Sequence, residues 1–268
     1  MKRIATLALV TLVAAALAAP AMAASVQVVG LQVMKPRPAK TANPMGESYV
    51  MGVQPGVTIH LHVADAGRKM LSLDREASKL ESFTDDQGAS LAPDKPDSLM
   101  DHWLGSWPKF SDDKHSCILQ VRTDKLPDKG AITIRVKGTL AIICGSDEKD
   151  TEAKNVRLRK GSGFRVGGQQ VKISDTGKAS YGGMKMTVTL QSSESFEAIQ
   201  NIEFVDADGK TIKSRRQQSS RSGFGGKRIY SVTYGLAESP NSATIKIKYF
   251  GKMETLKAPL DITVGAGL

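Results

Sequence analysis

Short stretches in which apolar and polar residues alternate recur along the chain, and they limit its fold more than any other feature. In residues 184–191, Met184, Met186, Val188 and Leu190 occupy every second position and polar residues fill the others. Side chains two residues apart project from the same face of a strand, so the pattern predicts a strand with one buried face. Turn-forming Gly, Pro, Asn and Asp separate these stretches, and long helical periodicity is absent. We therefore predict an all-β fold of antiparallel sheets.

The chain also resembles itself, which predicts two related domains. Four pairs of segments match in the same order, and they begin at Gly56 and Lys185, Ser82 and Glu203, Leu126 and Ser239, and Asn155 and Pro259. The last pair ends on Gly-x-Gly followed by one apolar residue in both copies. Several matches in one order indicate an internal duplication. The sequence therefore predicts two tandem immunoglobulin-like β-sandwich domains.

The first 23 residues have the composition of a secretory signal peptide. Lys2 and Arg3 precede an apolar run, and Ala21-Met22-Ala23 is a small-x-small cleavage site. We expect a mature protein that begins near Ala24 and is periplasmic or secreted, without a membrane span. The predicted division is a signal peptide over residues 1–23, a first sandwich over 24–164 and a second over 165–268.

The balance of charge suggests a kind of partner. The formal net charge is +10 and the isoelectric point is near 9.5. A basic exported protein is suited to an anionic glycan or an acidic envelope protein, although basic surfaces without a specific ligand are also common. Nucleic acid is disfavoured by the export signal and by the lack of a reader motif. We expect no cofactor.

Two inserts of opposite charge distinguish the predicted domains. The insert over about residues 92–116 is acidic and holds the chain's two tryptophans, Trp103 and Trp107. They offer an aromatic surface to a sugar or protein, or else form a lid over the first sandwich. The insert over about residues 213–228 is rich in Gly, Ser and Arg, which predicts a mobile loop.

The basic insert supplies the residues that we expect to bind an anionic or protein partner. Paired arginines such as Arg215 and Arg216 can grip phosphate or carboxylate with two hydrogen bonds. The expected binding residues are Arg215, Arg216, Arg221, Lys227 and Arg228, with Trp103 and Trp107 as the aromatic surface. A solvated hairpin tip is the alternative. Weak self-association between the oppositely charged inserts is a further prediction.

Two other groups of residues carry possible chemistry. His60 and His62 lie two apart on a predicted strand and therefore share a face, so the alternative function is periplasmic zinc or copper binding, with His102 or His115 as further ligands. Cys117 and Cys144 enter an oxidising compartment, and we predict a disulfide between them.

No motif of a known catalytic site is evident. The sequence contains no Gly-x-Ser-x-Gly elbow, no His-Glu-x-x-His segment and no phosphate-binding Gly-rich loop. We therefore predict a non-enzymatic binding or scaffolding protein of the cell envelope.

Overall fold

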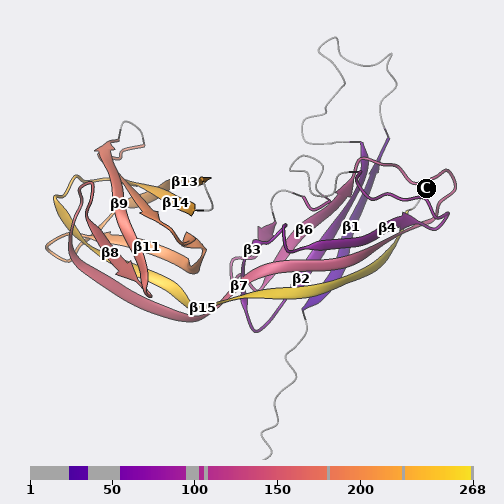
Figure 1. Cartoon of the computed structure of the whole chain (residues 1–268), viewed down its shortest axis with the longest axis horizontal. Helices are drawn as coiled ribbons and strands as arrows, with labels where there is room; N and C mark the ends of the chain where they lie inside the picture. Colours follow the sequence, from indigo (N-terminus) through magenta and orange to yellow (C-terminus); the bar gives the residue numbers. More distant parts are fainter. Residues whose placement is uncertain are drawn as a thin grey trace, which may run out of the picture.

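The computed structural model describes residues 24–35, 55–94, 103–105, 108–179, 182–224 and 227–266, so the predicted signal peptide lies outside the described residues. The all-β prediction is confirmed, because the only helical element among these residues is a short 3-10 helix, η2 (Phe196–Ala198). The strands form two lobes, on the right and left of Figure 1.

The first lobe is a sandwich of two antiparallel sheets. Its elements are β1 (Ser25–Met34), β2 (Gly56–Ala64), β3 (Lys69–Leu73), β4 (Lys79–Asp85), β5 (Lys109–Phe110), β6 (Ser116–Thr123) and the first half of β7 (Thr133–Arg157). One sheet has the order β1-β2-β6-β5, and β3 and β4 both pair with β7 in the other.

The second lobe is built in the same way. Its elements are β8 (Gly163–Val166), β9 (Gln169–Lys178), β10 (Met186–Ser192), β11 (Ile199–Val205), β12 (Thr211–Ile212), β13 (Ser214–Phe224), β14 (Lys227–Leu236) and the first half of β15 (Ser242–Gly265). One sheet has the order β13-β14-β10-β9-β8, and β12, β11 and β15 belong to the other.

Two long strands run through both lobes. β7 and β15 are 25 and 24 residues long, and they pair with each other from Thr133↔Gly265 at one end to Arg157↔Ser242 at the other. The first half of β7 lies in the first lobe and its second half in the second lobe, while β15 runs the opposite way (Figure 1). One six-stranded sheet is therefore shared by the two sandwiches.

Each lobe has its own hydrophobic core. The first core is built from residues between Val57 and Cys144 together with Leu256, Ala258, Leu260 and Ala266, all of which are buried. The second core is built from buried residues between Val156 and Ile247. The cores are thus not made from two consecutive stretches of chain, because β15 returns to the first lobe. The boundary after Phe164, which is buried in the second core, stays a prediction.

The lobes match in detail around β2 and β10, which contain the first pair of repeated segments. β2 lies between β1 and β6, and β10 lies between β9 and β14. β1 carries a bulge between Val28 and Gly30, opposite Leu61, and β9 carries one opposite Leu190. Bulges at matching places are typical of related sheets.

The second pair of segments forms the same turn in both lobes. Asp85 Oδ1 accepts hydrogen bonds from the backbone N–H groups of Gln87 (3.0 Å) and Ala89 (2.8 Å). Asp206 Oδ1 accepts from Asp208 (3.0 Å) and Lys210 (2.8 Å) in the same pattern. The glycines at the fourth turn position both have positive φ, which glycine adopts without strain.

The other two pairs of segments need correction. Phe83 pairs with Val136 and Phe204 pairs with Ile245, so Val136 and not Ile132 is the counterpart of Ile245. The two Gly-x-Gly endings belong to opposite lobes, because β7 ends in the second lobe and β15 in the first. The duplication and the immunoglobulin-like label therefore stay predictions.

A short two-stranded connection, which we call the waist, joins the lobes. It comprises residues 146–148 of β7 and 250–252 of β15. On one side, the pairing of β7 with β3 ends at Gly145; on the other, the pairing of β15 with β11 ends at Tyr249. Gly145 is required here, because a Cβ at this position would lie 2.4 Å from the buried ring of Phe250. Among the described strands, the waist residues pair only with one another.

The predicted disulfide is wrong in this structure. Cys117 on β6 and Cys144 on β7 are free, buried thiols in the first core. They belong to opposite sheets of the sandwich, and facing sheets commonly lie about 10 Å apart, whereas bonded cysteines need Cα atoms within about 7 Å. Burial raises the pKa of Cys117 to about 12 and that of Cys144 to about 11.

The described residues include no helix that is long and apolar enough to span a bilayer.

Candidate functional site

The basic insert is a β-hairpin, so the predicted mobile loop is wrong over the described part of this insert. β13 pairs with β14 over ten residue pairs, from Ser214↔Leu236 to Phe224↔Lys227. β10 supports β14 only as far as Tyr230. The end of the hairpin therefore projects beyond the strand that supports it. Its Gly and Ser content suggested a loop, but strand pairing decides the conformation here.

The two faces of this hairpin separate the predicted arginines. Val232 is buried in the second core, so the face that it shares with Tyr230 and Arg228 is the inward one. Arg221 pairs with Tyr230 and lies on that face, and so does Arg216, which pairs with the buried Tyr234. Arg215 projects from the opposite face. Because successive strand side chains point apart, Arg215 and Arg216 lie on opposite faces of the hairpin, and anion binding by this pair stays a prediction.

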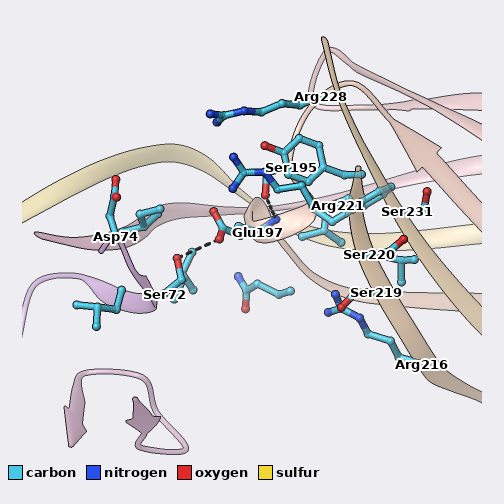
Figure 2. Close-up of a pocket in the computed structure, with 18 of the residues that line it drawn as sticks. Ser72, Asp74, Ser195, Glu197, Arg216, Ser219, Ser220, Arg221, Arg228 and Ser231 are labelled. Atoms are coloured by element: carbon cyan, nitrogen blue, oxygen red, sulfur yellow. Dashed lines mark hydrogen bonds between the residues drawn. The ribbon is translucent and has the colours of Figure 1, made fainter. Parts of the chain in front are cut away.

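The inward face of the hairpin forms one wall of a cleft between the lobes. The cleft has a volume of about 830 Å³, and Arg216, Arg221 and Arg228 line it. Figure 2 shows Arg221 and Arg228 extending into the space beside Ser195 and Glu197, while Arg216 approaches from farther along β13. Among the described residues, none of these arginines takes part in an ion pair.

A hydrogen bond joins the two lobes within the lining of the cleft. Ser195 caps η2, and its hydroxyl accepts from the Glu197 N–H at 3.2 Å. Ser72 on β3 of the other lobe donates to the Glu197 carboxylate at 3.0 Å (Figure 2). The contact orients the Glu197 carboxylate toward the first lobe. Asp74 lies on that same side of the cleft (Figure 2).

Arg75 adds an unpartnered cation to the wall from the first lobe. It follows β3, and its Nη2 atom is buried without a hydrogen-bond partner among the described residues. Burial, and secondarily the charge of Arg122, hold the pKa of its guanidinium below the ordinary value. An unpaired buried donor is costly, and Arg75 adds a fourth guanidinium to the residues that line the cleft.

The lining of the cleft has a clear chemical character. Five cationic residues line it, namely Arg75, Lys114, Arg216, Arg221 and Arg228. Against them stand three acids, Asp74, Glu76 and Glu197. Five serines and Tyr230 add hydroxyl groups. The cleft therefore offers positive charge to an anion together with partners for a ligand rich in hydroxyl groups.

Trp103 does not add an exposed aromatic surface. Trp103 is 2% exposed and belongs to the first core, where its carbonyl accepts from the Arg122 N–H at 2.8 Å. Trp103 therefore serves packing of the first core, and a lid over the open end of the sandwich stays a prediction. Trp107 lies outside the described residues, as does the side chain of Lys227.

The histidines are only partly brought together. His60 and His62 project from the outer face of the first lobe, because the residues that alternate with them are buried. Their cross-strand neighbours are Gln120 and Ile118 on β6, and Gly30 and Gln27 on β1. His115 is within hydrogen-bonding distance of the Asp65 carbonyl, and His102 lies outside the described residues. No group of three or more potential metal ligands occurs in the described part of the chain.

Sequence reasoning missed the wall of the cleft that belongs to the first lobe. Arg75, Ser72 and Glu197 are isolated polar residues near strand ends, a pattern that occurs throughout the chain. These residues come together only because of how the two lobes are oriented about the waist. Alternation of apolar and polar residues does not predict that orientation. A search of known protein families, curated proteins and solved structures finds no match to this chain.

Proposed function

We propose that the protein is an exported, non-enzymatic binding or scaffolding protein of the cell envelope, and that its cleft holds an anionic, hydroxyl-rich ligand such as an acidic oligosaccharide. The observation that carries the proposal is the convergence of Arg216, Arg221 and Arg228, without ion pairs among the described residues, on one cleft. Arg75, on the first lobe, adds a further cation to the lining of the same cleft.

The chemistry of the lining supports a sugar acid over a simple anion. Guanidinium groups bind carboxylate or phosphate with two parallel hydrogen bonds. The serines of the lining can pair with ring hydroxyls, and Tyr230 offers an aromatic face with a polar edge. A cleft of about 830 Å³ has room for a short oligosaccharide.

Location in the periplasm or outside the cell is part of the proposal. Its support is the sequence of residues 1–23, with its basic start, apolar run and Ala-x-Ala site. Acidic glycans are anionic ligands that such a compartment offers to a basic protein. Metal binding by His60 and His62 is not proposed, since a zinc site needs more ligands than one pair of histidines.

We also propose that the two lobes descend from one duplicated immunoglobulin-like module whose copies exchange their last strands. The supporting features are the matching bulges of β1 and β9 and the matching turns at Asp85 and Asp206. In this proposal the second half of β7 completes the second lobe, and the second half of β15 completes the first. Exchange of an identical element between copies is domain swapping, here within one chain.

Binding of trigalacturonate tests the function. We expect calorimetry at low salt to detect binding that weakens as NaCl is added, and no binding of the neutral galactose trisaccharide. Replacing both Arg221 and Arg228 by Ala removes charge-assisted hydrogen bonds worth about 1.5–3 kcal/mol each, so affinity falls at least about tenfold. Arg215→Ala is the matched control, because Arg215 lies on the opposite face of the same strand. Equal losses in both variants, or no loss in the double variant, contradict the proposal.

A further inference from the structure

A second basic surface lies at the end of the second lobe, where β7 finishes. Two adjoining recesses, of about 550 and 760 Å³, share Arg157 and Arg159 in their linings. Lys154 and Lys160 line the first recess as well, and Lys178 and Lys185 line the second. We call these six residues the tip patch. No Asp or Glu lines either recess within the described residues.

Most cations of the tip patch form no ion pair with an acidic side chain among the described residues. Lys154 forms an ion pair with Glu152 at 2.9 Å. The other five cations have no ion pair among the described residues, and all five are exposed. Arg135 and Lys137, near the start of β7, contrast with them, because Asp261 on β15 contacts both. Like charges that lie close together repel, so binding of an anion lowers the electrostatic free energy of the tip patch.

The backbone holds this surface in place. Leu158 is buried between Arg157 and Arg159, and its N–H donates to the Asn241 carbonyl at 2.9 Å. The Arg159 carbonyl accepts from the Ser162 N–H at 3.1 Å. On the neighbouring hairpin, the Lys185 carbonyl accepts from the Ala179 N–H at 3.2 Å, next to Lys178. Backbone hydrogen bonds therefore hold the chain in place beside the cations of both recesses.

We propose that the tip patch binds a linear polyanion that carries charge along its length, such as an anionic polysaccharide. The two recesses share Arg157 and Arg159, so the cationic surface is longer than a single phosphate or carboxylate group. This site is separate from the cleft. A chain that is charged at many units releases its counterions to such a surface, which makes binding strong at low salt.

Two other classes of polyanion fit less well. Membrane-docking surfaces add exposed Trp, Phe or Leu to their basic residues. The large exposed apolar residues in the described part of the chain are Val29, Ile118, Ile132, Ile229 and Met253, and none of them lines either recess. Single-stranded nucleic acid is held by aromatic stacking, and no aromatic residue lines either recess.

The test uses the full chain and fluorescent dextran sulfate as the probe, with anisotropy measured over a series of NaCl concentrations. Replacing Arg157 and Arg159 by Ala should lower affinity at low salt at least tenfold. It should also reduce the slope of log K against log[NaCl] by about two. Replacing Lys178 and Lys185 by Ala should give a smaller loss in the same direction. All four side chains are exposed, and a thermal melt of each variant checks that it folds.

A matched pair removes the same charge from elsewhere in the same lobe. Lys246 and Lys248 are exposed on β15, beside Glu203, Glu152 and Asp150. Their double Ala variant should change dextran sulfate affinity less than about twofold. An equal loss in this control overturns the proposal, because net charge alone then explains binding. Tighter binding to single-stranded DNA or to phosphatidylglycerol vesicles than to dextran sulfate also overturns it.

The outcome is distinguishable from failure of the cleft proposal. The tip variant lacking Arg157 and Arg159 should keep its affinity for trigalacturonate. The cleft variant lacking Arg221 and Arg228 should keep most of its affinity for dextran sulfate. If the cleft variant instead loses as much dextran sulfate affinity as the tip variant, the polymer binds along the cleft and the tip proposal is wrong.

Discussion

Four strands follow one another in the same order in the two lobes, β1-β2-β6-β5 and β9-β10-β14-β13, and the last strand of each series differs most between the lobes. In the first lobe, β6 has a two-residue neighbour, β5. In the second lobe the strand at the matching place, β13, is eleven residues long. β13 contributes Arg216 and Arg221 to the lining of the cleft, and its partner β14 contributes Arg228. In the proposed function, the sandwich that the lobes have in common supplies stability and the longer edge strand of the second lobe supplies binding.

The largest expected effect comes from separating the lobes. A fragment comprising residues 24–164 lacks Leu256, Ala258, Leu260 and Ala266 of the first core. Burying the two leucines alone is worth about 1.5–3 kcal/mol each, a large share of the stability of a small domain. We expect this fragment to be unfolded as a monomer. If it folds, it should do so as a dimer in which each copy lends the second half of β7 to the other.

Light scattering coupled to size exclusion, with a thermal melt of the same sample, decides this prediction. A monomer that melts cooperatively would show that the first lobe does not need β15. The proposal of exchanged strands would then be wrong. The full chain serves as the control, and it should melt cooperatively.

A smaller effect is expected from the matching turn residues. Asp85 is 4% exposed, and its carboxylate also accepts from the Asp128 N–H at 2.8 Å, a contact without a counterpart at Asp206 in the described structure. Burial alone would raise the pKa of Asp85, but backbone N–H groups of Asp128, Ala89 and Gln87 outweigh it and hold the pKa below its ordinary value. Asp85→Ala should cost about 2–3 kcal/mol of unfolding free energy, and Asp206→Ala about 1 kcal/mol.

The pH dependence of this difference follows from the lowered pKa. A carboxyl group with a depressed folded pKa stabilises the fold above its unfolded pKa of about 3.9, and it loses this contribution as pH falls through the folded value. The stability gap between the wild type and Asp85→Ala, measured by urea unfolding, should therefore be full near pH 6 and shrink below about pH 4. A gap of equal size at pH 3 and pH 6 would contradict the role of the carboxylate.

The smallest effect is expected from reducing agent. Both cysteines are buried thiols in the first lobe, with pKa values raised to about 12 and about 11. At pH 8 almost none of either group is thiolate, so a thiol reagent should react slowly with the folded protein and rapidly with two groups after unfolding. Dithiothreitol should leave the melting temperature unchanged. A loss of several degrees, or a count of no free thiols, would indicate the disulfide that the sequence alone predicts.

Sequence reasoning succeeded where the structure is local. Alternation predicts β2 and β10, and the turn-forming Gly and Asp between alternating stretches fall at the turns after β4 and β11. It failed where strands choose partners far away in the chain. Nothing in residues 133–157 says that one strand serves two sandwiches, and Gly138 and Gly145 resemble strand breaks. The disulfide prediction failed for the same reason, because the spacing of two cysteines in the sequence does not fix the distance between two sheets.

The candidate site was half predictable for a similar reason. The charge of the second insert identified Arg216, Arg221 and Arg228 before any geometry was known. Charge alone did not separate them from Arg215, because the inward face is defined by the pairing of β13 with β14. The opposite wall, with Arg75 and Ser72, depends on contact between the lobes.

The waist gives the cleft a mechanical property. Among the described strands, only residues 146–148 and 250–252 connect the lobes as a paired ribbon, and two-stranded ribbons twist more than wide sheets. A ligand that bridges Arg75 and Arg221 would contact both lobes at once. If the proposed ligand binds both residues, a small rotation at the waist would change the opening of the cleft, and ligand occupancy would depend on the angle between the lobes.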